Sequence, residues 1–400
     1  MSPDTSFGIG TPAALRESSA RRNVRLDGCL PSDILTLNSL ALRSLSWLFD
    51  EKEQLFCERV TLGKDGYRRG RVSRKHTVVA LLGLHHFGKS GETSPFDTKA
   101  IENAVLQDRS WVKSAGELGL STWLAAVGLS DQLDTILDEF SSDRALSSYA
   151  DGRAVKTSGL AWLLAGIAHA ALAQPARTSE LTDVAVDIYR LLRDNQSQGG
   201  LFGHAASARS PRGVLWGRFG TFYDQISAIY ALSIFAKAFQ VEEPLESALA
   251  CANSICALQG DLGQWWSLYD KRTGCVVNRY PVLSAYQDGI APCALLALGE
   301  ATGRSFHHAI RKGLSWITET NELGVDLRIE DRGLIWDSID FDKRSARYWD
   351  AVLGFVNVSR HEQASKLKIR CEARPDHFGW LLYAFGEVGL PNGRSLAAHA

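Results

Sequence analysis

The sequence lacks several features that define large classes of protein. It has no excess of one charge, since 44 Lys and Arg stand against 45 Asp and Glu, and so gives no global electrostatic reason to expect nucleic acid as a partner. No window approaches about eighteen uninterrupted apolar residues, and the start, Met1-Ser-Pro-Asp4, lacks the regions of a secretory signal. We therefore expect a cytoplasmic protein without an integral membrane span, acting on a small molecule or an oligosaccharide; the oligomeric state stays open.

Zinc-type cysteine clusters are also lacking. The seven cysteines, an odd number, lie at positions 29, 57, 251, 256, 275, 293 and 371, without a CxxC pair. This scatter is typical of buried small side chains or thiols rather than metal ligands. We expect neither a metal nor a cofactor.

What the sequence does contain is helical hairpins. Residues 161–171, 228–239 and 291–298 are apolar nearly all the way round, which requires burial on most faces. Each is followed, after a short connection, by an amphipathic helix with a single apolar stripe, as at Ile188, Leu249 and Ile310. The pattern predicts buried helices, each covered by the helix that follows.

The hairpin repeats in residues as well as in pattern. Tyr223, Ala228, Ala231 and Leu232 recur sixty-three positions later as Tyr286, Ala291, Ala294 and Leu295. Independently, Gln196-x3-Gly200-x-Phe202 matches Gln259-x3-Gly263-x-Trp265. Because neighbouring hairpins must cover each other, closing them into a ring removes both exposed ends. We predict an all-α fold: a single (α/α) toroid of about five to six hairpins over residues 31–400, after a flexible leader at 1–30.

Long connections separate the hairpins, at about 195–222, 259–286 and 320–345. Loops of this length in a compact domain are usually functional, and ring geometry places all of them on one face. Residues 265–280 also predict a β-hairpin that turns across 270–274.

These features resemble known toroids. Helical hairpins with long loops on one face, here about 150–390, are similar to the six-hairpin glycosidases and to the terpenoid cyclase and prenyltransferase group. The Gln-x3-Gly-x-aromatic echoes resemble the repeat motif of squalene-type cyclases, which ties an outer helix to the next loop. The Asp-x-Asp-Asp acid motif of class II cyclases is missing. The stretch from Trp265 to Tyr280, with Tyr269-Asp270, looks like the helical domain of glucuronyl C5-epimerases and implies a sugar substrate.

Two matched acidic segments are the candidate catalytic residues. Asp224 and Asp288 lie at the starts of two inner helices, preceded by Tyr223 and Tyr286. In the 63-residue repeat their positions differ by one residue, because Tyr-Asp-Gln in one copy is Tyr-Gln-Asp in the other. Paired carboxylates suit acid/base catalysis on a glycosidic bond, and a tyrosine can serve if a cation lowers its pKa. Helix capping is the structural alternative for both aspartates.

The remaining candidates are polar or aromatic residues on the long loops, expected to bind substrate. Arg218 and Arg279 are candidate cations for the tyrosines or for a uronate, or else ion-pair partners that hold a loop. Aromatic faces suit sugar rings or a carbocation, or else plug the ring. The substrate-binding set is Arg218, Gln225, Trp265, Tyr269, Asp270, Arg279, Tyr280, Gln287, His204, Trp336 and Asp337, with Phe202, Trp216 and Trp266 as further loop aromatics.

Three functions remain open at this point. The first is a carbohydrate-active enzyme, a hydrolase, lyase or epimerase for a glycosidic or uronic-acid substrate, using acid/base catalysis at the loop-bearing face. The second is an atypical terpenoid cyclase with an aspartate acid and an aromatic pocket. The third is a non-catalytic binding toroid, in which both aspartates only cap helices.

Overall fold

Twelve helices alternate between an inner and an outer layer in the computed structural model, which describes residues 31–138, 140, 155–206, 217–318, 320–341 and 367–388. The predicted leader at 1–30 and Trp216 lie outside these residues. The inner helices are α2 (Arg74–Gly88), α4 (Ala115–Val127), α7 (Thr157–Ala173), α10 (Phe222–Phe239), α12 (Ala291–Thr302) and α15 (Pro375–Phe385). The outer helices are α1 (Pro31–Leu48), α3 (Thr98–Gln107), α5 (Gln132–Asp138), α8 (Thr178–Asp194), α11 (Glu243–Ala257) and α13 (His307–Thr318).

The inner helices form a closed ring. Each packs against the next in chain order, and α15 packs against α2, which closes the circle. At this seam the backbones nearly touch, because a Cβ on Gly83 would overlap the backbone of Gly379. Outer helices α3, α5, α8, α11 and α13 cover the inner helices that precede them, while α1 covers α15. The fold is therefore the predicted (α/α) toroid, built in the described residues from five hairpins and the pair of α15 with α1, and it extends through α2 and α4, before the stretch in which the repeat is readable.

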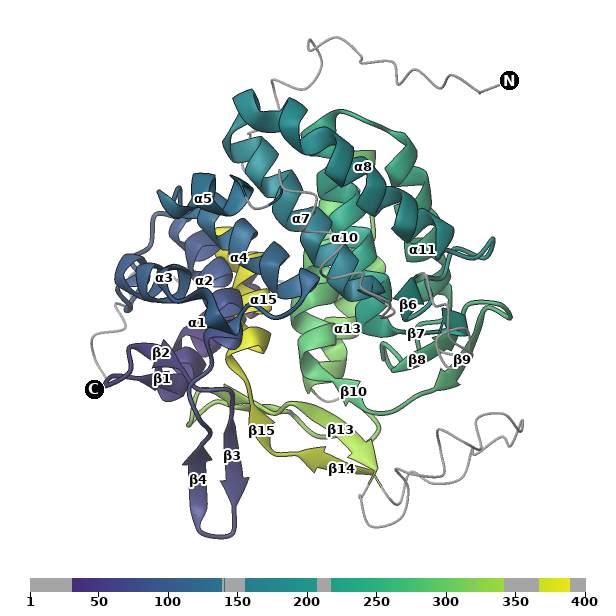
Figure 1. Cartoon of the computed structure of the whole chain (residues 1–400). Helices are drawn as coiled ribbons and strands as arrows, with labels where there is room; N and C mark the ends of the chain where they lie inside the picture. The colour runs from purple at the N-terminus through teal and green to yellow at the C-terminus, as the bar shows by residue number, and fades with distance from the viewer. Residues whose placement is uncertain are drawn as a thin grey trace, which may run out of the picture.

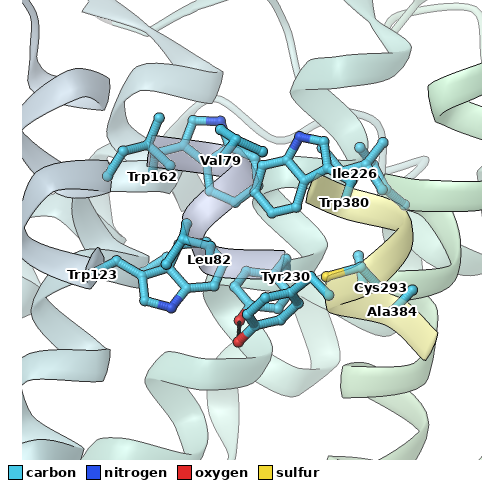
Figure 2. Packing of buried hydrophobic residues seen from close by; sticks show 14 of the residues in the cluster. Val79, Leu82, Trp123, Trp162, Ile226, Tyr230, Cys293, Trp380 and Ala384 are labelled. Carbon is cyan, nitrogen blue, oxygen red and sulfur yellow. Dashed lines mark hydrogen bonds between the residues drawn. The ribbon is translucent and has the colours of Figure 1, made fainter. Parts of the chain in front are cut away.

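Large aromatic side chains fill the axis of the ring. Trp123 stacks on Trp162, His169 and Tyr230, and Trp162 stacks on Trp380. Figure 2 shows these indoles and Tyr230 gathered among apolar residues from several inner helices. Burying one such ring contributes about 2–3 kcal/mol.

All the described strands lie in connections that run from an outer helix to the next inner helix. They are β1 (Phe49–Asp50), β2 (Leu55–Phe56), β3 (Val60–Gly63), β4 (Gly66–Arg69), β5 (Val155–Lys156), β6 (Ala205–Ala206), β7 (Phe219–Thr221), β8 (Leu268–Asp270), β9 (Cys275–Asn278), β10 (Val282–Leu283), β11 (Arg328–Ile329), β12 (Leu334–Ile335), β13 (Ser338–Phe341), β14 (Leu367–Arg370) and β15 (Glu372–Ala373). The antiparallel pairing of β8 with β9 confirms the predicted β-hairpin. In Figure 1, β10 and β13–β15 lie with the β3–β4 hairpin at the lower edge, below the helices. We call the side of the ring where the inner helices begin the mouth face.

The two copies of the Gln-x3-Gly-x-aromatic motif connect neighbouring hairpins. The Gln196 side chain donates to the carbonyls of Gly200 and of Ser247 in α11, and Gln259 donates to those of Gly263 and of Ala309 in α13. Gly263 has φ +101°, and a Cβ there would overlap the Lys312 carbonyl. The motif thus requires glycine for both backbone conformation and close approach.

Two smaller expectations concern membranes and thiols. No single helix in the described part of the chain has the length and apolar character to cross a bilayer, while the sharply bent pair Thr157–Ala173 and Pro175–Asp194 meets those criteria jointly. The six described cysteines are thiols, and Cys57, Cys251 and Cys293 are buried, as expected.

Candidate functional site

The two tyrosine-led segments lie side by side on the mouth face. Tyr223 and Asp224 occupy the first turn of α10, and Tyr286 and Asp288 lie in the π-helical turn η3 (Tyr286–Ile290) that leads into α12. The Tyr223 and Tyr286 rings stack with centroids 6.4 Å apart. The structure therefore brings the two matched segments together.

Asp224 forms a helix cap. Its Oδ2 accepts from the backbone N–H of Thr221 at 2.9 Å and from the Thr221 hydroxyl at 2.6 Å, completing a capping box, while Oδ1 accepts from the Ser158 N–H at 3.2 Å. His204 Nδ1 adds a fourth contact, 2.8 Å from Oδ2. The side chain is fully buried. Of the two interpretations left open by the sequence, the structure shows the cap; a role in proton transfer stays a prediction.

Asp288 has a different environment. It is also fully buried, but its Oδ1 is 2.7 Å from Nε2 of His377 in α15, and its Oδ2 has no hydrogen-bond partner. Burial opposes the charge on His377, yet the carboxylate of Asp288, helped by Asp337 and Asp376, raises the pKa of that imidazole. The pair thus joins a buried carboxyl group to a histidine of raised pKa, and one carboxyl oxygen has no hydrogen-bond partner.

Asp337 is the third carboxyl of this cluster. The strand before η3 holds its segment in place, because the Ser284 N–H donates to the Asp337 carbonyl at 2.8 Å. Burial raises the pKa of Asp337 above the usual value, against the lowering effects of Arg374 and His377. Its Oδ2 accepts a hydrogen bond from the Ser338 hydroxyl at 3.2 Å. Its raised pKa makes Asp337 suited to carry a proton.

Both tyrosines remain protonated. Burial raises the pKa of Tyr223 and of Tyr286, and nearby carboxylates raise them further. The expected cations lie elsewhere: Arg218 Nε donates to Asp270 at 2.9 Å, and the guanidinium of Arg279 lies 5.3 Å from the Trp266 ring. Contrary to the expectation, neither arginine lowers the pKa of Tyr223 or Tyr286, and Arg218 forms the ion pair of the alternative interpretation.

Several predicted substrate-binding residues support the loops from within. The Gln225 side chain exchanges hydrogen bonds with the backbone of Phe202, and Tyr280 donates to Glu322 at 2.8 Å. Asp270 also accepts from the Arg272 N–H at the hairpin turn. Trp265, Tyr269 and Gln287 are buried, and Trp265 stacks on Phe222. Trp336 is buried beneath Tyr67, with which it stacks. Contact of these residues with a substrate stays a prediction.

Four residues of the cluster were missed by sequence reasoning: Trp162, Arg374, Asp376 and His377. His377 and Asp376 follow Pro375, a helix-starting residue, so Pro-Asp-His before an apolar helix was the available signal. Asp376 and Arg374 each have a buried side-chain atom, Oδ1 and Nε respectively, without a hydrogen-bond partner. Within the described ranges, no group of three or more His, Cys, Asp or Glu side chains is arranged to hold a metal ion.

Solved structures resemble this (α/α) toroid over nearly the whole length of both chains. The chain is similar to an unsaturated glucuronyl hydrolase specific for heparin, with a TM-score of 0.57 and 15% identity over 89% of this chain and 97% of that one. A possible member of the GH105 family from Klebsiella pneumoniae also has a TM-score of 0.57, at 12% identity over 95% and 98% of the two chains.

A third similar structure is a sugar epimerase from a ruminal bacterium, with a TM-score of 0.57 and 10% identity over 91% of this chain and 100% of that one. No protein-family model matches the sequence, and no curated protein matches it. At these identities the likeness establishes the (α/α) toroid fold over nearly the whole chain.

Proposed function

We propose that this chain is a carbohydrate-active enzyme that hydrolyses a glycosidic bond at the mouth face. The observation that carries the proposal is that Asp337 and Asp288 lie in one buried cluster but have different partners. Burial raises the pKa of Asp337 and favours its protonated form, whereas Asp288 contacts His377, whose pKa its carboxylate raises. Paired carboxyls that differ in this way serve as acid and base in glycoside hydrolysis.

Each group has a defined role in the reaction. Asp337 donates its proton to the leaving oxygen as the glycosidic bond breaks, and the unused Oδ2 of Asp288 accepts a proton from the attacking water. His377 holds Asp288 in place through the 2.7 Å contact and balances its charge before that proton arrives. Proton exchange with solvent then restores both carboxyls for the next cycle.

The other functions fit the site less well. A tyrosine base for epimerisation or elimination requires a lowered pKa, and both tyrosines have raised values. A non-catalytic toroid requires both aspartates to cap helices, which Asp224 does and Asp288 does not. A terpenoid cyclase favours an apolar mouth, whereas this cluster contains Asp288, Asp337, Arg374 and His377.

The same residues and the similar solved structures support a proposal for the substrate class. A glycosidic substrate, with or without a uronic acid, suits the carboxyls and the stacked tyrosines. Arg374, which interacts electrostatically with Asp337 and Asp376, is the group we expect to bind a uronate carboxylate. Replacing it with Gln should raise KM for uronate-containing substrates and leave KM for neutral ones within about twofold.

The test is a substrate panel combined with two isosteric variants. Purified protein is incubated with neutral, uronate-containing and unsaturated-uronyl oligosaccharides, and new reducing ends are measured. Asp288→Asn and Asp337→Asn should each lower kcat/KM by about 10²–10⁴-fold, the range for a lost general acid or base. An unchanged rate in either variant would show that the substituted residue is not the catalytic acid or base. Exchange of solvent deuterium into the sugar without new reducing ends would favour epimerisation.

A further inference from the structure

Trp162 lies in the second turn of α7 and contacts Tyr223 of the candidate site. Its indole N–H donates to the hydroxyl oxygen of Tyr223 at 2.8 Å, and its side chain is 3% exposed. The sequence indicated only that this residue belongs to an apolar inner helix.

Neighbouring rings fix the orientation of this indole. Trp162 stacks on Trp380 with centroids 5.0 Å apart and planes 18° from parallel, and on Trp123 at 6.0 Å and 28°. Figure 2 shows Trp162 and Trp380 side by side, with Trp123 and Tyr230 beneath them. Because stacked rings on three inner helices restrict its rotation, the N–H points at Tyr223 with little freedom.

The hydrogen bond determines what the Tyr223 hydroxyl can do. An indole N–H can only donate, so the tyrosine oxygen must accept and its own proton must point elsewhere. Among the described residues, Trp162 is the one hydrogen-bond partner of this hydroxyl. Tyr223 is partly exposed and stacks on Tyr286, so its O–H lies beside the segment that carries Asp288.

We propose that Trp162 is a positioning residue, which orients the Tyr223 hydroxyl so that its proton is donated to an oxygen of the bound sugar. The inference rests on the proposed function and deepens it, since it assigns a substrate contact to Tyr223 and its orientation to the aromatic stack. It requires a substrate with an acceptor oxygen near the reacting bond, as every glycoside has.

A double-mutant cycle in the full-length protein tests the proposal. Tyr223→Phe should lower kcat/KM on the best oligosaccharide of the panel by about 10- to 100-fold, the effect of one lost hydrogen bond in a desolvated site. Trp162→Phe should lower it by about 5- to 10-fold, because the hydroxyl loses its fixed direction. In the Tyr223→Phe background, Trp162→Phe should change the rate by less than about twofold, because the group it orients is absent.

Trp316→Phe is the matched control. It also removes a buried indole N–H that donates a hydrogen bond, to Glu322 at 2.9 Å, but Trp316 lies on outer helix α13, so its effect on kcat/KM should multiply with that of Tyr223→Phe without coupling. Thermal melts of all five variants separate loss of folding from loss of positioning. In the NMR spectrum, the indole N–H signal that disappears in Trp162→Phe should shift in Tyr223→Phe and stay in place in Tyr286→Phe.

The possible outcomes are distinguishable. Coupling between Trp162 and Tyr223 together with an NMR shift supports the proposal. Full multiplicativity of their effects overturns it, even if Asp288→Asn and Asp337→Asn still abolish turnover. If the protein cleaves no member of the panel, the proposed function fails first, and this inference falls with it.

Discussion

Replacing Asp288 by Asn should separate catalysis from stability, because the chain contains a matched control. Glu102 in α3 is also fully buried, and its carboxylate lies 2.8 Å from Nε2 of His85. It packs beside Gly128, at the end of α4 away from the mouth face. Asp288 and His377 form the same kind of pair, at 2.7 Å, within the mouth. The two sites differ in position and share a buried carboxyl–histidine contact, to which Lys99 Nζ adds a hydrogen bond at 3.3 Å in the case of Glu102.

The structure sets the size of both effects. Removing one charge of a buried pair costs about 3–5 kcal/mol when the other charge stays. In both variants the new amide oxygen can still accept a hydrogen bond from the histidine, which reduces the cost to about 1–3 kcal/mol. Asp288→Asn and Glu102→Gln should therefore lower the melting temperature similarly, by about 2–6 °C for a chain of this size.

Activity should separate the two variants. Asp288→Asn should lower kcat/KM by about 10²–10⁴-fold, while Glu102→Gln should keep it within about twofold, as a substitution distant from the reacting groups does. The assays are calorimetry and reducing-end release under one buffer condition. Equal losses of activity in both variants would show that the loss reflects folding, and would refute the assignment of Asp288.

Further predictions concern Asp337, His377 and the repeat glycines. Asp337→Asn should raise the melting temperature at pH 7. Because the pKa of Asp337 is raised in the folded state, its protonated form stabilises the fold below the unfolded-state pKa of about 4, and this stabilisation is lost as the pH rises through the folded-state pKa. Calorimetry at pH 4 and 7 checks that the gain appears only at pH 7. His377→Gln should cost most at pH 6 and less at pH 9, because its raised pKa stabilises the fold below about 6.5 and that contribution is lost as the pH rises through the folded value; a cost that is constant with pH would contradict this. Gly263→Ala should cost about 3 kcal/mol or more, from strain and overlap with Lys312. Gly274→Ala, with φ +72° and open space around it, should cost about 1–2 kcal/mol in the same denaturant titration.

The toroid was predictable because its repeat survives in residues that ring geometry constrains. Gln196 and Gln259 reach the next outer helix, and Gly200 and Gly263 each adopt positive φ where a Cβ would overlap that helix. Because substituting these glutamines and glycines would destabilise the fold, the Gln-x3-Gly motif can be recognised in both repeats. The earlier inner helices α2 and α4 lack that repeat, so the prediction of a ring over residues 31–400 did not locate them individually.

The candidate site was predicted in position more than in detail. Asp224 and Asp288 look equivalent in sequence, yet Thr221 lies three residues before Asp224 and completes a capping box, whereas Ala285 precedes the turn that carries Asp288. The Thr-x-x-Asp spacing was readable beforehand. The partner of Asp288 was not, since His377 lies 89 positions away and reaches it only because the ring places α12 beside α15.

The pH dependence of kcat/KM, measured for the wild-type chain and for Asp337→Asn on the best oligosaccharide of the panel, tests the acid/base assignment most directly. Burial raises the pKa of Asp337, so the wild-type rate should fall as the pH rises through a value above that of an ordinary aspartate. In Asp337→Asn that fall should disappear along with most of the rate. A variant that keeps both the wild-type rate and its alkaline limb would contradict the account.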